Sequence, residues 1–123
     1  MIGYVTLGTN DFPRAAKFYD ALMGEIGAKR VMDFGTFVVW GKGKTGLPGL
    51  CVTLPYDKQK ATIGNGVMVA LTAASKEEVD KLYSKAIALG ATDEGKPGPR
   101  GDGFYAAYFR DLDGNKLNFF CMG

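Results

Sequence analysis

Residues 108–120 read YFRDLDGNKLNFF, and this stretch has the form of a β-hairpin. Two short apolar runs flank Asp113-Gly114, a dipeptide that forms tight turns because glycine tolerates a positive φ. After the turn, one set of residues alternates with another along the second strand: Leu117, Phe119 and Cys121 with Lys116, Asn118 and Phe120. The neutral amide of Asn118 therefore lies in mid-strand, on a sheet face that must accommodate a polar group.

Upstream, residues 4–8 (YVTLG) alternate like a strand and lead into a helix. Asn10 or Asp11 is expected to cap this helix, and Gly27 to end it. The apolar residues of the segment recur at helical spacing and predict one buried stripe: Phe12, Ala15, Ala16, Tyr19, Leu22, Met23 and Ile26.

The same order recurs in the second half of the chain. Residues 67–72 form a predicted strand, Ser75 and Glu78 a capping box, and Gly90 the end of a second helix. The second apolar stripe consists of Val79, Leu82, Tyr83, Ala86 and Leu89. Because the two halves match at a nearly constant offset of about half the chain, we interpret them as an internal duplication.

Each half is predicted to be a strand, a helix and three further strands. The further strands are expected at residues 29–33, 36–41 and 49–54, and at 92–95, 103–110 and 115–121. We predict an α+β fold in one domain, residues 1–123, of two βαβββ modules. Module one covers about 1–55 and module two about 67–123, joined by a polar linker at 56–66. The sheets are expected to form a cup-shaped, partly open β-barrel with the helices on its outer face.

If the helices cover one sheet face, strand alternation places a second set of residues on the other face. This set consists of Tyr4, Thr6, Met68, Ala70, Tyr108, Asn118 and Phe120. It is mixed and partly polar, so we expect it to line the cup and Asn118 to face water.

Composition excludes several classes of function. The 123 residues carry a net charge of +2 without a Lys/Arg run, so we expect neither a nucleic-acid nor a membrane partner. No apolar run approaches a membrane span and Met1 leads directly into a strand pattern, so we expect a cytoplasmic protein. Cys51 and Cys121 lie in apolar runs and are interpreted as buried, reduced thiols. There is no histidine, the usual general base and metal ligand.

The chain resembles the vicinal oxygen chelate superfamily, which includes glyoxalase I, extradiol dioxygenases and the fosfomycin- and bleomycin-resistance proteins. Three stretches carry the resemblance: VTLGTNDFPRAAKFYDAL near the start, GNGVMVALTAAS opening the second half, and YFRDLDGNKLNFF near the end. The resemblance implies the fold but not one reaction, because this fold hosts many functions.

Metal-dependent members carry ligands at positions that the resemblance places on Tyr4, Met68 and Asn118. None of these is a normal ligand for a divalent transition metal. A further ligand position would lie within residues 50–55, which contain no Asp, Glu or His. We therefore expect no metal and no cofactor, and Asn118 would stand in place of a metal-binding Glu.

Other candidates have two interpretations each. Tyr108 matches a substrate-contacting Tyr of the fosfomycin-resistance proteins, or is a cross-strand aromatic. Trp40, predicted to share a face with Val38, stacks on a ligand or packs half-buried. Residues 95–103 (GKPGPRGDG) are a solvated loop, or a lid whose Arg100 meets a carboxylate or phosphate. Residues 41–46 (GKGKTG) contain G-x-G-x-x-G, but no helix pattern follows, so we predict a loop rather than a dinucleotide site.

Three classes of function stay open at this point. The leading hypothesis is metal-free binding of a small molecule, with candidate residues Tyr4, Thr6, Trp40, Met68, Arg100, Tyr108, Asn118 and Phe120. The alternative is a glyoxalase-like enzyme that works through Tyr4, Tyr108 or Arg100, or with an unexpected metal. The third is a structural or regulatory dimer without a ligand. In each case we expect a homodimer.

Overall fold

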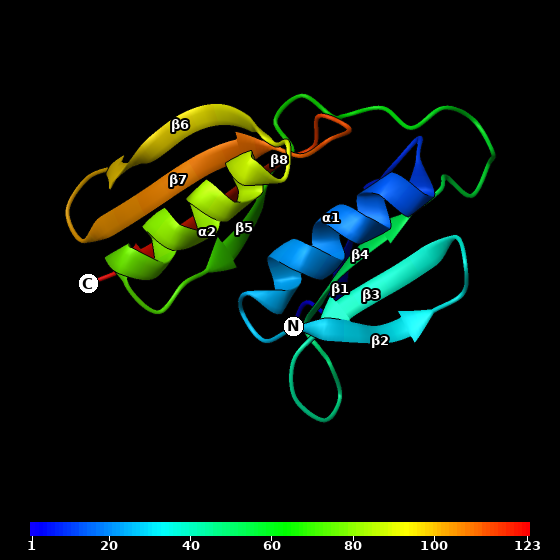
Figure 1. Ribbon diagram of the computed structural model, residues 1–123, viewed down its shortest axis with the longest axis horizontal. Coiled ribbons are helices and arrows are strands. Elements are labelled where there is room, and N and C mark those ends of the chain that lie inside the picture. The colour runs from blue at the N-terminus through cyan, green and yellow to red at the C-terminus, as the bar shows by residue number, and fades with distance from the viewer. The chain divides into compact units, whose positions relative to one another are not determined.

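The computed structural model describes all 123 residues and contains two compact units, residues 1–63 and 64–123. Each unit is a four-stranded sheet with one helix on one face (Figure 1). The division falls inside the segment predicted as a linker. The two βαβββ modules and the α+β class are confirmed, and both sheets are open rather than closed into a barrel. Neither helix is long and apolar enough to span a membrane.

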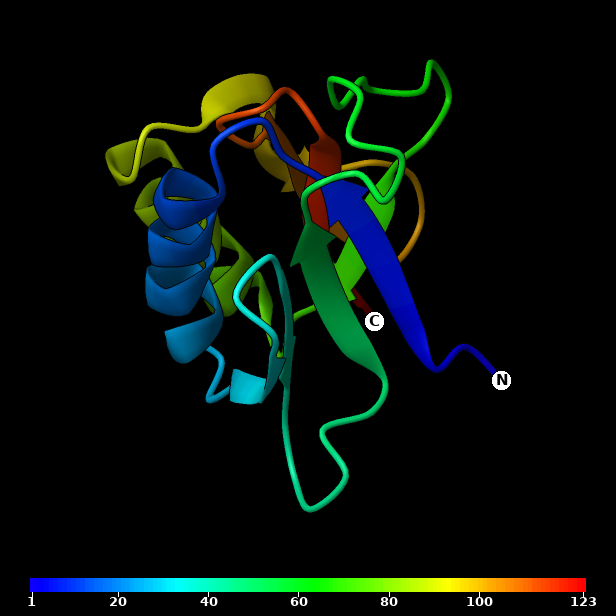
Figure 2. The same ribbon diagram turned by 90° about the vertical axis from the view of Figure 1, so that its right-hand side faces the viewer.

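Unit 1 contains β1 (Tyr4–Gly8), α1 (Phe12–Gly24), β2 (Lys29–Asp33), β3 (Phe37–Gly41) and β4 (Gly49–Thr53). The strand order is β1-β4-β3-β2, with β1 parallel to β4 and the other pairs antiparallel. Figure 2 shows α1 on one side of this sheet and no helix on the other. The loop at residues 42–48 leads directly into β4, as expected for a connection that is not a dinucleotide-binding turn.

Unit 2 repeats the plan with β5 (Val69–Thr72), α2 (Lys76–Ala88), β6 (Thr92–Pro99), β7 (Phe104–Arg110) and β8 (Lys116–Met122). The order β5-β8-β7-β6 and the parallel β5–β8 pair are the counterparts of unit 1. The prediction was wrong for β6, which continues four residues beyond its expected end at Gly95. Two register irregularities let the strand follow β7 as far as Pro99, so the expected loop shrinks to residues 100–103.

The helix ends explain why the two halves look alike in sequence. Asp11 caps α1 by accepting a hydrogen bond from the Arg14 amide, and Ser75 caps α2 by accepting one from the Glu78 amide. Asn10, the other predicted cap of α1, instead forms two hydrogen bonds with the backbone of Ala61 in the linker segment.

The two C-terminal ends also match. Gly27 and Gly90 adopt φ of 79° and 108°, a conformation that favours glycine. This turn lets the Ala28 amide reach the Met23 carbonyl and the Ala91 amide reach the Ala86 carbonyl, both at 3.0 Å. The duplication read from the sequence is therefore also a duplication of hydrogen bonds.

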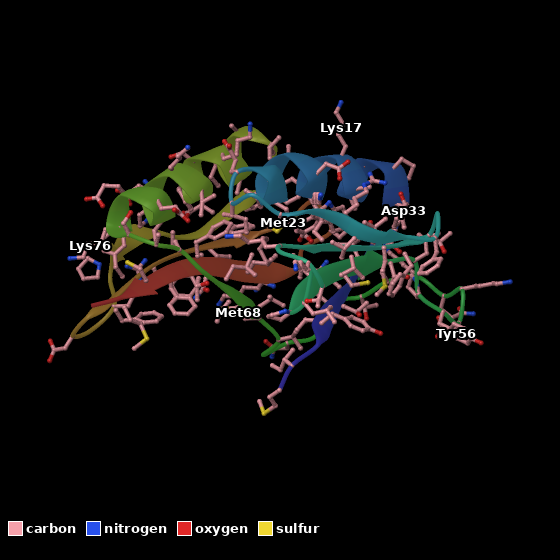
Figure 3. All side chains as sticks on the ribbon, turned by 90° about the horizontal axis from the view of Figure 1, so that it is seen from below. Lys17, Met23, Asp33, Tyr56, Met68 and Lys76 are labelled. Carbon is pink, nitrogen blue, oxygen red and sulfur yellow. The ribbon has the colours of Figure 1, made fainter.

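The predicted apolar stripes face the sheets. The buried residues of α1 are Ala15, Ala16, Phe18, Tyr19, Leu22 and Met23, and those of α2 are Val79, Leu82 and Ala86. Figure 3 shows Met23 between α1 and its sheet and Lys17 on the outer side of the same helix.

Candidate functional site

The sheet of unit 2 has one face against α2 and one without a helix, here called the open face. Tyr105 marks the helix-facing side of β7, because its hydroxyl donates to Asp80 of α2 at 2.6 Å. The next residues alternate, so Phe104 and Tyr108 lie on the open face. Phe104 stacks on Phe120 of β8 with ring centroids 5.4 Å apart, which assigns Phe120 to the same face.

Asn118 lies at the centre of this open face. It pairs in register with Tyr108 of β7 on one side and with Ala70 of β5 on the other. The prediction that these residues share a face is consistent with that register. The expectation that Asn118 faces water was wrong, because its side chain is 1% exposed.

The buried Asn118 carbonyl is unusual in having no hydrogen-bond partner. Most buried side-chain oxygens in folded proteins accept at least one hydrogen bond. Leaving an acceptor buried and unpaired costs about 1–3 kcal/mol. This oxygen therefore lacks a donor that a ligand or a water molecule can supply, and because it is buried, such a donor reaches it only when a neighbouring side chain moves.

The Tyr108 ring beside Asn118 is flanked by two cations. The Arg100 guanidinium carbon lies 5.5 Å from the ring centroid and the Lys116 ammonium nitrogen 5.6 Å from it. Both distances are within the range in which cations are attracted to an aromatic face. The open face thus combines an aromatic ring, two positive charges and an unpaired amide oxygen.

Two glycines of β6 leave room for the Arg100 guanidinium. A Cβ at Gly98 would lie 3.0 Å from the Arg100 Nη1, and one at Gly95 would lie 3.4 Å from its Nη2 and 3.1 Å from the Tyr108 ring. The guanidinium also donates to the carbonyls of Lys96 and Pro99. The strand end therefore holds this side chain back over the Tyr108 ring.

Met68 and Phe120 complete the predicted residues of unit 2. Met68, just before β5, is exposed and projects on the side of the sheet away from α2 (Figure 3). Phe120 is half-buried in its stack with Phe104. Both add apolar surface to the open face.

In unit 1, Tyr4 and Thr6 lie on the face of the sheet away from α1. Tyr4 is 50% exposed and meets Phe37 edge-on at 6.2 Å between ring centroids. Thr6 is exposed, pairs in register with Cys51 and hydrogen-bonds its thiol. Burial raises the pKa of the Cys51 thiol, so this cysteine is a poor nucleophile, as expected from its apolar surroundings.

Trp40 lies on the other side of that sheet. Its indole N–H donates to Asp20 of α1 at 2.9 Å, its ring packs against Tyr19 at 5.6 Å, and it is 2% exposed. Arg30 donates to both oxygens of Asp20 and lowers the pKa of that carboxyl. The structure therefore does not bring Trp40 to the face of Tyr4 and Thr6, and it favours the packing interpretation.

The side chains at the three metal-ligand positions do not fit a divalent transition metal. A phenol, a thioether and a neutral amide occupy these positions in Tyr4, Met68 and Asn118, whereas such ions prefer imidazole, thiolate or carboxylate ligands. Within the chain, no group of three or more His, Cys, Asp or Glu side chains is arranged to hold a metal.

Lys116 is a residue of the open face that sequence reasoning missed. The signal was present, because Lys116 precedes Asn118 by two positions in a strand and must share its face. It was overlooked because a lysine beside a turn is usually a solvated side chain.

Comparison with known proteins assigns the fold to a known family. The family model of the Glyoxalase/Bleomycin resistance protein/Dioxygenase superfamily matches residues 1–119. A glyoxalase/bleomycin resistance protein from Albidiferax ferrireducens is similar, with 36% identity, a TM-score of 0.87, and coverage of 98% of this chain and 97% of that chain. A comparison with curated proteins gives no match.

Two more distant structures have the same fold. A hypothetical protein, SA1046, from S. aureus has 29% identity and a TM-score of 0.74, covering 98% of this chain and 92% of that chain. A lactoylglutathione lyase from Agrobacterium tumefaciens has 23% identity and a TM-score of 0.69, with the same coverage of 98% and 92%. At 23% identity the likeness extends to the fold alone.

Proposed function

The chain belongs to the glyoxalase/bleomycin resistance protein/dioxygenase superfamily, and from this premise we propose that it binds a small molecule without a metal on the open face of unit 2. The resemblance inferred from the sequence is thereby confirmed at the level of the family. The specific function rests on the chemistry of the residues around Asn118.

The unpaired carbonyl of Asn118 is the observation that carries the proposal. A buried acceptor without a partner destabilises the free protein, and a ligand donor removes that cost on binding. The surroundings support the same conclusion, because small-molecule sites are mostly apolar with a few polar groups that orient the ligand. Here the apolar groups are Met68, Phe120 and the Tyr108 ring.

Native mass spectrometry of freshly purified protein tests this proposal. We expect a small molecule to be retained by the wild type, and by Lys81→Met, which changes an exposed residue of α2. Asn118→Leu should retain about two- to tenfold less, since it removes a hydrogen bond worth about 0.5–1.5 kcal/mol. Equal retention by Asn118→Leu and wild type would contradict the proposed role of the amide. Conversion of the retained molecule in the presence of a chelator would instead assign an enzyme.

We also propose that the protein is a homodimer. Unit 1 exposes Ile2 and Tyr4 at 58% and 50%, and unit 2 exposes Val67 and Met68 at 57% and 41%. Each of these pairs is a candidate for burial against a second copy of the chain. Light scattering should give twice the chain mass at micromolar concentration, and a monomer at that concentration would contradict this.

A further inference from the structure

Of the four arginines of the chain, Arg100 differs from the other three in having no carboxylate partner. Arg14, Arg30 and Arg110 each lie within 4.0 Å of a carboxylate oxygen, whereas Arg100 has no carboxylate partner. Its guanidinium makes its two hydrogen bonds to backbone carbonyls. A guanidinium has five N–H donors, so three remain for another acceptor.

Lys116 shares this property. It forms no ion pair, and its ammonium group lies over the same Tyr108 ring as the Arg100 guanidinium. Arg110, in register with Lys116 across the β7–β8 pair, is already paired with Glu94 at 2.8 Å. The open face around Tyr108 therefore carries two positive charges that no carboxylate of the chain balances.

Contacts with β6 support the placement of Arg100. Any side chain at Gly98 would press on the guanidinium, and the carbonyls of Lys96 and Pro99 hold it from behind. A surface arginine without such contacts loses side-chain entropy when it binds a ligand. An arginine whose guanidinium is already hydrogen-bonded to the backbone loses less.

We propose that Arg100 and Lys116 form an anion-binding site that recognises a carboxylate or phosphate of the ligand, with the rest of the molecule against the Tyr108 ring. The inference rests on the proposed function, because it assigns the charge of the molecule bound beside Asn118. The ligand is then an organic anion that also carries a hydrogen-bond donor, such as a hydroxyl or amino group, for the Asn118 carbonyl. Charged hydrogen bonds of the Arg–carboxylate and Arg–phosphate kind are among the strongest in proteins.

Titration of the ¹⁵N-labelled protein with four probes tests this inference. The probes share a phenyl ring and differ in charge: benzoate and phenyl phosphate are anions, benzamide is neutral and benzamidine is a cation. We expect benzoate, phenyl phosphate or both to shift the amide signals of Gly95, Gly98 and Tyr108. Benzamide should bind at least tenfold more weakly, because it loses a charged hydrogen bond, and benzamidine should not bind there. The ratio of the two anions distinguishes a carboxylate from a phosphate site.

Matched variants separate a placed contact from general attraction. Arg100→Met and Lys116→Met should each weaken anion binding about tenfold, whereas Lys81→Met, which removes the same charge on α2, should not change it. Gly98→Val keeps every charge but requires the guanidinium to give way, so it should weaken binding by less than Arg100→Met does. Melting curves of all four variants establish that they are folded.

Three outcomes would overturn the inference. The first is equal affinity for benzoate and benzamide, and the second is no shift of the amide signals with either anion. The third is an equal loss of anion affinity in Lys81→Met and Arg100→Met. If a neutral molecule is retained in native mass spectra while no anion binds, the anion site is refuted and the proposed function stands. If nothing is retained and no probe binds, both are refuted.

Discussion

Replacing Asn118 by leucine should stabilise the protein, although the position is in the middle of a strand. Leucine has the same number and branching of side-chain heavy atoms, the site is 1% exposed, and the change removes the buried carbonyl that lacks a partner. That carbonyl costs about 1–3 kcal/mol, and removing it should raise the free energy of unfolding by up to this amount. The melting temperature should then rise by about 3–6 °C for each kcal/mol.

Leu117→Ala is the matched control, one residue away on the helix-facing side. Leu117 is fully buried, and truncation of a core leucine costs about 2–5 kcal/mol, so this variant should melt well below the wild type. Both variants are measured by thermal and urea unfolding after native mass spectrometry has shown the samples to be ligand-free. If Asn118→Leu is destabilised as much as Leu117→Ala, the amide is well bonded in the folded protein and the reasoning about its carbonyl is refuted.

Three other outcomes are expected. Gly41→Ala should cost about 1–3 kcal/mol in urea unfolding, because its Cβ would lie 1.8 Å from the Gly46 carbonyl oxygen; an unchanged midpoint would contradict this close approach. Asp20→Asn should lower the stability of the protein at pH 7. Arg30 lowers the pKa of Asp20 in the folded state, so the stabilisation is lost on protonation and the difference from the wild type should shrink as the pH falls below 3.8. A difference in melting temperature that stays constant in acid would exclude this ion pair as the cause. Elemental analysis should find no stoichiometric zinc, nickel, manganese or iron, and one metal per chain would overturn the interpretation of the ligand positions.

The order and kind of the elements could be predicted from the sequence because local signals agreed. Ser75 and Glu78 indicated where α2 begins, and Gly27 and Gly90 indicated where the two helices end. The period-2 pattern after the turn predicted a last strand at residues 115–121, and β8 covers Lys116–Met122. The extension of β6 could not be predicted, because glycine and proline in residues 95–99 indicate a loop locally. Only pairing with β7 across two register irregularities keeps them in the sheet.

The faces of the strands were harder to assign where both sides are buried. Residues 38–41 are all buried, so β3 has no alternation to indicate which side faces α1. The face of Trp40 became clear only from its hydrogen bond to Asp20. For Asn118, alternation predicted the face but not the burial, because exposure depends on what covers a strand and not on the strand's own sequence.

The expected absence of a metal and the proposed anion site both depend on the residue at position 118 of β8. The resemblance places a metal-binding carboxylate at position 118, where its negative charge would lie beside the cations that flank Tyr108. With a neutral amide at this position, neither Arg100 nor Lys116 has a carboxylate partner, and the proposed site keeps both positive charges. A positive face repels a divalent metal ion and attracts an anion, since both effects depend on the sign of the same local charge. On the proposal made above, the amide at position 118 therefore replaces a metal ligand of the kind that the resemblance implies and leaves a face that favours an anionic ligand.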